Sequence, residues 1–222
     1  MTLLKTVFGA ALVTGALSAT SAFAASTTYD GILFPDGDIS FADSVKSLNF
    51  GNPQPTNTSS LNPLNAVGAP DSTSVSLGRG GVIVVEFTDN ALTGSGNSDA
   101  DLHIFEIGSD VEDTFVEISQ DGINFIDVGK VFGSTSSIDI DPFLAAEGLL
   151  SSALFTFVRL TDDPNEGQSS GQFVGADIDA VGAISSAPPP TPIVAPVPLP
   201  AGLVLGATAF AALGVARRRR KA

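Results

Sequence analysis

Six short runs of residues that favour β-structure follow one another from residue 82 onward, and they limit the folds that this chain can adopt. Each run has the length of a strand and is rich in Val, Ile and Phe, and Gly, Asp, Asn and Ser fill the gaps. The runs are residues 82–87, 101–107, 114–119, 123–129, 154–161 and 177–184. Many short strands with few helices predict an all-β fold, an antiparallel β-sandwich.

The stretch FVEISQDGINFIDVG (115–129) predicts a β-hairpin. Asp121 and Gly122 lie between its two β runs, and an Asp-Gly pair favours a two-residue type I′ turn, because both central residues of that turn need positive φ. Side chains alternate along a strand, so Val116 and Ile118 are expected to face the same side of the sheet.

One short helix is expected at DPFLAAEGLL, with Asp141 as the N-cap, Pro142 at the first helical position and Gly148 near the end. Residues 25–80 have a different character, because Ser, Thr, Asn, Pro and Gly dominate them. We expect this part of the domain to be rich in loops, with one or two edge strands.

Residues 1–24 have the pattern of a secretory signal peptide. Lys5 supplies the positive charge, an apolar run follows, and small residues predict cleavage between Ala24 and Ala25. The pattern indicates export by the general secretory route, and it leaves residues 25–185 as a single acidic β-domain.

The other end of the chain predicts a membrane anchor. Residues 186–198 are rich in Pro and are expected to form a semi-rigid stalk. Residues 199–216 carry no charge, and as a helix they would span about 27 Å, close to the roughly 30 Å core of a bilayer. Five basic residues follow and would stay on the cytoplasmic side. They are Arg217, Arg218, Arg219, Arg220 and Lys221.

Charge and cysteine content exclude several functions. Between the two ends of the chain, four basic residues oppose 24 acidic ones, which gives a net charge of −20. Such a domain cannot bind nucleic acid through phosphate contacts, whereas it suits salty surroundings or divalent cations. The chain has no cysteine, so disulfides, thiol nucleophiles and Cys-ligated zinc are excluded as well.

Catalytic residues are scarce. His103 is the only histidine, no G-x-S-x-G motif is present, and a zinc site with several His ligands is impossible. We expect His103 to be a surface residue of a strand and the protein not to be an enzyme.

Calcium binding is the chemistry that the sequence favours. Ca²⁺ prefers six to eight oxygen ligands from carboxylates, amides and carbonyls. Asp177 and Asp179 lie two residues apart in one predicted strand, where their charges repel each other unless a cation or Arg159 offsets them. The preferred ligands are Asp101, Glu106, Asp177 and Asp179, and the second choice is Asn97, Asp99, Asp162 and Asp163. The alternative is that these residues form solvated acidic turns, with Asp179 paired to Arg159.

A resemblance accounts for the end of the chain. The motif Val197, Pro198, Leu199, Pro200 and Ala201, followed by a Gly-rich apolar run and an Arg cluster, resembles the VPLPA variant of the PEP-CTERM sorting signal of exported bacterial proteins. The match covers residues 197–222, although a literal Pro-Glu-Pro is missing. The resemblance implies transient retention in the inner membrane, cleavage near residues 198–201 by a VPLPA-specific exosortase, and transfer to the cell surface or extracellular matrix.

The middle domain loosely resembles galactose-binding-like β-sandwich domains, which implies a jelly-roll fold. Four pieces carry this resemblance, at residues 101–106, 115–125, 157–162 and 175–183. The expected role is structural or adhesive, and the alternative is a secreted module that binds extracellular polysaccharide, with Ca²⁺ as a candidate cofactor. The chain has no Trp, and Tyr29, its only tyrosine, is expected in a flexible N-terminal region, so a stacking platform for sugars is not expected.

Overall fold

The computed structural model describes residues 25–108, 112–132, 136–167 and 170–190. All of them except Pro190 belong to a compact unit that ends at Pro189. The predicted signal peptide, the sorting motif and the predicted membrane helix lie outside the described residues. Within the described part of the chain, no helix is long and apolar enough to cross a bilayer.

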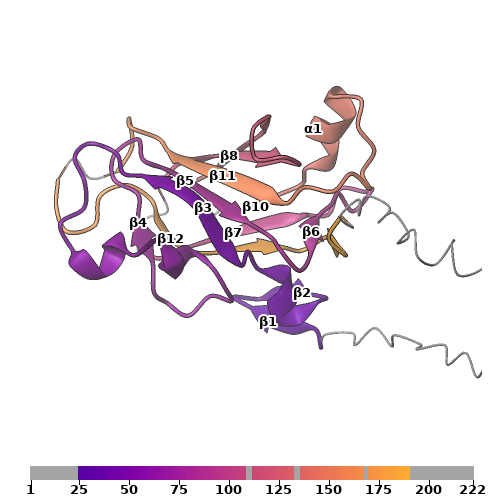
Figure 1. Ribbon diagram of the computed structural model, residues 1–222, viewed down its shortest axis with the longest axis horizontal. Helices are drawn as coiled ribbons and strands as arrows, with labels where there is room; N and C mark the ends of the chain where they lie inside the picture. The colour runs from indigo at the N-terminus through magenta and orange to yellow at the C-terminus, as the bar shows by residue number, and fades with distance from the viewer. Residues whose placement is uncertain (1–24, 109–111, 133–135, 168–169, 191–222) are drawn as a thin grey trace, which may run out of the picture. The chain divides into compact units, whose positions relative to one another are not determined.

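Two antiparallel sheets make up most of the domain (Figure 1). The larger sheet has the strand order β3 (Ser44–Asn49), β5 (Val82–Glu86), β11 (Phe157–Asp162), β8 (Thr114–Ser119) and β9 (Ile126–Val131). The smaller sheet has the order β10 (Ser137–Ile138), β7 (Leu102–Glu106), β12 (Asp177–Ala183) and β4 (Val75–Ser76). Each of the six predicted β runs overlaps one of these strands, so the all-β, antiparallel prediction is confirmed.

Two further pairs of short strands complete the domain. The hairpin of β1 (Thr27–Tyr29) and β2 (Ile32–Phe34) forms one pair, and β6 (Ala91–Leu92) with β13 (Ser186–Ala187) forms the other. The first two residues of the predicted stalk thus lie in β13, next to β6.

The main hydrophobic core draws side chains from both large sheets, which lie as two layers in Figure 1. Val85, Ile118 and Leu160 come from the five-stranded sheet, and Ile104 and Ile178 come from the four-stranded sheet. All five side chains are excluded from solvent. Burying apolar side chains of this size contributes about 1.5–3 kcal/mol each, so this core is the main source of stability in a domain without disulfides.

The predicted hairpin forms, but its turn is longer than expected. Val116 and Ile118 are both buried on one face of β8, as predicted. Ile118 pairs with Ile126 of β9, so residues 119–125 form the connection. The prediction of a two-residue Asp-Gly turn is therefore wrong.

Hydrogen bonds within the loop explain its length. The carboxylate of Asp121 accepts hydrogen bonds from the backbone N–H groups of Ile123 and Asn124, both at 2.8 Å. The hydroxyl of Ser119 accepts from the N–H groups of Asp121 and Gly122. These side chains accept hydrogen bonds from the backbone N–H groups of the open loop. They therefore stabilise the open loop relative to a tight two-residue turn.

Helix α1 (Asp141–Ala146) lies where it was predicted, although its first residues have other roles. Ile140, not Asp141, is the N-cap, and no side chain caps the helix. The Asp141 carboxylate accepts a hydrogen bond from the N–H of Gly96 at 2.7 Å and none from its own helix. Gly148 follows the helix with φ +72°, as expected for a C-terminal glycine.

Residues 25–80 are rich in loops, as predicted, but besides three 3-10 helices they contain two edge strands of the large sheets and the β1–β2 hairpin, which was not predicted. The helices are η1 (Gly37–Ser40), η2 (Thr58–Leu61) and η3 (Pro63–Ala66), and the edge strands are β3 and β4. Tyr29 is not in a flexible segment. It lies in β1, and its ring packs edge-on against Phe41, with 5.2 Å between ring centroids.

Candidate metal site

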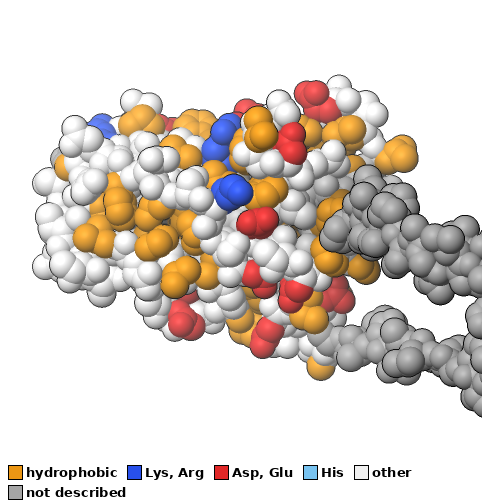
Figure 2. Space-filling model, viewed as in Figure 1, with side chains coloured by type: hydrophobic (Ala, Val, Ile, Leu, Met, Phe, Trp, Pro, Cys, Tyr) orange, Lys and Arg blue, Asp and Glu red, His pale blue; other side chains and the backbone are white. Residues whose placement is uncertain are grey.

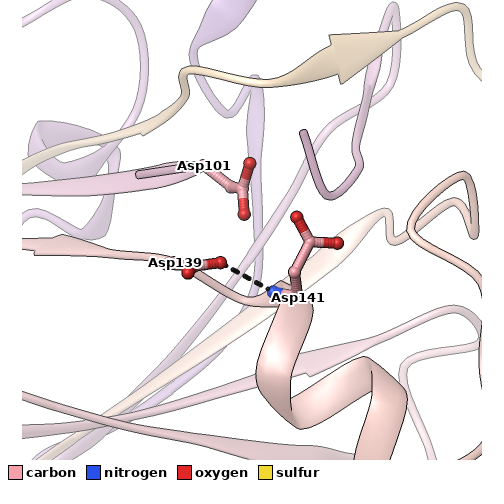
Figure 3. Close-up of side chains that lie close together, drawn as sticks. All are labelled: Asp101, Asp139 and Asp141. Atoms are coloured by element: carbon pink, nitrogen blue, oxygen red, sulfur yellow. Dashed lines mark hydrogen bonds between the residues drawn. The ribbon is translucent and has the colours of Figure 1, made fainter. Parts of the chain in front are cut away.

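Three aspartates converge at one end of the four-stranded sheet (Figure 3). Asp101 directly precedes β7, Asp139 directly follows β10, and Asp141 begins α1. Because β7 and β10 are antiparallel partners, with Ile138 opposite Leu102, the start of one strand adjoins the end of the other. Carboxylate oxygens of the three residues lie within 4.8 Å of one another.

Asp101 is the buried member of this cluster, with no exposed surface. One of its oxygens accepts a hydrogen bond from the N–H of Ser95 at 2.7 Å, and the other accepts from the N–H of Ile140 at 3.0 Å. Burial raises the pKa of Asp101, although hydrogen bonds from Ser185, Ile140 and Ser95 oppose this effect. Asp101 therefore joins the loop before β7 to the start of α1.

Asp139 and Asp141 are partly exposed and complete the cluster. Asp139 accepts a hydrogen bond from the N–H of Asp141 at 3.0 Å, as Figure 3 shows. Hydrogen bonds, chiefly from the Ser151 hydroxyl and then from the N–H of Gly96, lower the pKa of Asp141. Its Oδ1 atom is buried and has no hydrogen-bond partner among the described residues. The backbone of Gly94 closes over this oxygen, since a Cβ at Gly94 would lie only 2.2 Å from it.

Among the described residues, no basic side chain forms an ion pair with these carboxylates. Arg159 pairs with Glu117, and Lys130 pairs with Asp113 and Asp163. The remaining basic residues contact other groups, since Lys46 lies over the ring of Phe157 and Arg79 donates to the carbonyl of Pro164. Acidic side chains are scattered over the face in Figure 2, and basic ones are visible only in its upper part. The cluster is therefore a concentration of negative charge with oxygen ligands of the kind that Ca²⁺ prefers.

The preferred predicted ligands do not meet at one point. Glu106 lies at the far end of β7 from Asp101, five residues away, which corresponds to about 16 Å along a strand. Its Oε1 accepts hydrogen bonds from the N–H groups of Glu112 and Asp177, at 3.1 and 3.4 Å. Asp177 itself accepts a hydrogen bond from the hydroxyl of Ser76 on the paired strand β4. Only Asp101 of the preferred set belongs to the aspartate cluster.

Asp179 is engaged elsewhere. Its carboxylate accepts hydrogen bonds from the N–H groups of Asp71 and Ser72, at 3.2 and 3.1 Å. A register shift in β12 falls between Ile178 and Ala180, where Asp179 lies. The pair between Asp179 and Arg159, which was part of the alternative to calcium binding, is wrong, because Arg159 lies in β11 of the other sheet, where it faces Glu117 on β8.

The second set of predicted ligands divides between two places. Asn97 and Asp99 belong to the loop before Asp101, where the Ser95 hydroxyl reaches the Asn97 side chain at 3.3 Å. Asp162 is buried and accepts from the N–H groups of Gly80 and Ala176, at 2.7 and 2.8 Å. Asp163 accepts from Lys130 and from Asn165. Of this second set, only Asn97 and Asp99 are placed to contribute oxygen ligands at the aspartate cluster.

His103 is buried, which contradicts the expected surface position. Its exposed fraction is 9%, and its ring packs against Phe105 with 4.4 Å between centroids. Nδ1 lies 2.7 Å from the hydroxyl of Ser137. Burial lowers the pKa of His103 to about 4, so the imidazole is neutral at physiological pH.

Asp139 and Asp141 are not among the ligands predicted from the sequence, which places Asp141 at the helix cap. The signal was the spacing, because two aspartates alternate there with the buried residues Ile138 and Ile140, as Asp177 and Asp179 alternate in β12.

The chain matches no family model, no curated protein and no solved structure in the comparisons made.

Proposed function

We propose that this protein is an exported cell-surface or extracellular-matrix protein with a structural or adhesive role, and that its acidic domain binds Ca²⁺ at Asp101, Asp139 and Asp141. The observation that carries the calcium proposal is the convergence of these three carboxylates, one of which has a buried oxygen without a hydrogen-bond partner among the described residues. A divalent cation would offset their mutual repulsion and fill that vacant bonding position.

The proposed location depends on the two ends of the chain. A signal peptide at residues 1–24 and the VPLPA-like signal at residues 197–222 support export, retention in the inner membrane and processing by an exosortase. A jelly-roll arrangement of the two sheets, similar to galactose-binding-like domains, is part of the same proposal. A non-catalytic role agrees with the neutral, buried state of His103.

A calcium ion at this site would link three elements of the fold whose carboxylates otherwise repel one another. Asp101 continues into β7, Asp139 follows β10, and Asp141 opens α1. Binding to the folded state alone raises stability by about 2.7 kcal/mol at a hundredfold excess of ligand over Kd. For a domain of this size, the melting temperature should rise by about 5–10 °C.

Thermal unfolding of the full chain tests the calcium proposal. The melting temperature is measured with millimolar Ca²⁺, with Mg²⁺ at equal concentration, and with excess chelator. We expect a rise with Ca²⁺ only, and we expect Asp139→Asn combined with Asp141→Asn to abolish it, because Asn keeps the shape and loses the charge.

The matched control is Asp127→Asn, which removes one exposed carboxylate on β9 of the other sheet. This variant should retain the full response to Ca²⁺. Equal melting temperatures with Ca²⁺ and with chelator would refute the calcium site and leave the three aspartates as a structural hydrogen-bond cluster.

A further inference from the structure

A cavity of about 400 Å³ opens where β4 and β12 meet η2 and η3, apart from the aspartate cluster. Most of its lining consists of hydroxyl and amide side chains. They include Asn57, Ser60, Asn65, Ser72, Thr73 and Ser74. A cavity of this volume is in the range that holds small organic ligands.

Internal hydrogen bonds hold the walls of this cavity in place. The side-chain amide of Asn65 donates to the carbonyls of Ser59 and Ser74, at 3.0 and 2.8 Å. Ser72 has a φ of +69°, a conformation that non-glycine residues rarely adopt, and its N–H is bound to Asp179. The cavity is therefore formed before any ligand arrives.

Hydroxyl groups on one wall are available to a ligand. Within the described residues, the side-chain hydroxyls of Ser72, Thr73 and Ser74 make no hydrogen bond to protein groups, although the backbone of all three residues does. Each hydroxyl can both donate and accept a hydrogen bond, so together they suit a ligand that carries several hydroxyl groups.

Asp177 is the one ionisable residue among the described residues that line the cavity. Its carboxylate accepts a hydrogen bond from Ser76, and none of the described ion pairs involves it. Negative charge without a basic partner in a partly buried cavity favours a positively charged ligand.

Phe173 adds an aromatic surface to the same cavity. Its side chain is 44% exposed, so its ring is accessible to a ligand. The chain just before it is anchored, because the N–H groups of Thr56 and Asn57 donate to the carbonyls of Gly171 and Gln172, at 3.2 and 3.1 Å. An aromatic face attracts a cation and also packs against the apolar side of a sugar ring.

We propose that this cavity binds a small hydroxylated amine in its protonated form, such as an amino-sugar unit. The ammonium group would pair with Asp177, the ligand's hydroxyls would bond to the Ser72–Ser74 wall, and its apolar face would lie on Phe173. The site shares no residue with the aspartate cluster, so the two proposals are independent.

Isothermal titration calorimetry of the full chain with glucosamine tests this proposal, and glucose serves as the neutral analogue of the same size. Excess chelator is present throughout, so the result does not depend on calcium. We expect saturable binding of glucosamine with a stoichiometry of one, and binding of glucose at least tenfold weaker.

Two variants locate the binding site. Asp177→Asn, which can still accept from Ser76, should weaken glucosamine binding at least tenfold, and Asp127→Asn on β9 should leave it unchanged. Phe173→Leu keeps an apolar side chain but removes the ring, and it should weaken binding several-fold. If Asp177→Asn does not fold, Phe173→Leu still tests whether glucosamine binds in this cavity.

Three results would overturn the proposal. They are the absence of saturable glucosamine binding, equal affinities for glucose and glucosamine, and an unchanged affinity in both site variants.

Discussion

Asp101 and Glu106 stand at the two ends of β7, and burial raises the pKa of both carboxyl groups. Both oxygens of Asp101 accept backbone hydrogen bonds, at 2.7 and 3.0 Å. Glu106 is less well satisfied, because its Oε2 is buried and has no partner among the described residues. Burial raises the pKa of Glu106 to about 8, so in the folded protein this side chain is mostly protonated and neutral below about pH 8.

Glu106 should make the stability of the domain depend on pH. Its pKa is about 8 in the folded state, against an ordinary value of 4.5. Between these values the folded chain holds a proton that the unfolded chain has released, so stability is full below about pH 4.5 and is lost as pH rises through 8. Glu106→Gln removes this titration. Between pH 5 and 8, the free energy of unfolding of the variant should therefore fall by about 3 kcal/mol less than that of the wild type.

Urea unfolding at pH 5, 6, 7 and 8 measures this difference. Glu147→Gln, at an exposed position just after α1, controls for the loss of one carboxylate and should follow the wild-type curve. Parallel curves for the wild type and Glu106→Gln would show that Glu106 does not titrate in this range.

Asp162→Ala should destabilise the domain strongly. The buried carboxylate accepts hydrogen bonds from the N–H groups of Gly80 and Ala176, so its loss leaves two backbone donors without partners. We expect a loss of about 3 kcal/mol in urea unfolding. Asp127→Ala removes an exposed carboxylate whose one hydrogen bond within the described residues is from the nearby N–H of Gly129, and it should cost less than about 1 kcal/mol. Similar losses in the two variants would contradict the assigned role of Asp162.

Gly148 and Gly175 have the same φ but different surroundings, so substituting each by Ala distinguishes the cost of backbone strain from the cost of a steric clash. Gly148 and Gly175 both have φ +72°, but a Cβ at Gly148 would meet nothing within 4 Å, whereas a Cβ at Gly175 would lie 2.4 Å from the carbonyl oxygen of Gly78. Gly148→Ala should cost about 1–2 kcal/mol for the left-handed conformation alone. Gly175→Ala should cost more than 3 kcal/mol, or prevent folding, because a backbone segment has to move. Thermal or urea unfolding would measure both, and equal costs would refute the close approach at Gly175.

Removal of residues 191–222 should change the location of the protein without unfolding the domain. The compact unit ends at Pro189, so the truncated chain keeps the complete core. Expressed with its signal peptide in a Gram-negative host, the full chain should partition with the membrane and the truncated chain with the soluble exported fraction. Cell fractionation followed by limited proteolysis measures both location and folding. A truncated chain that stays with the membrane would contradict the proposed anchor.

Much of the fold could be predicted from local patterns. Val116 and Ile118 lie on either side of Glu117, and a strand must send alternate side chains to opposite faces, so burial of both on one face followed from the sequence. The turn after them could not be predicted in the same way. Asp121-Gly122 favours a tight turn by itself, but hydrogen bonds from Ser119 and Asp121 stabilise a wider loop.

The candidate site was harder to predict, because its residues come from separate parts of the chain. Asp101 was identified from its acidic surroundings, whereas its partners Asp139 and Asp141 are about forty residues away in the sequence. Only the pairing of Leu102 with Ile138 brings them together.

The sequence by itself predicted the six β runs from residue 82 onward, the buried face of β8 and the sign of the net charge. These properties depend on alternation, composition and run length, which are local. The tertiary structure alone decided that His103 is buried, that Arg159 pairs with Glu117 and not with Asp179, and which aspartates lie together. The physical reason is that side-chain partners depend on which strands are neighbours and in what register, and both are set by the packing of the whole core.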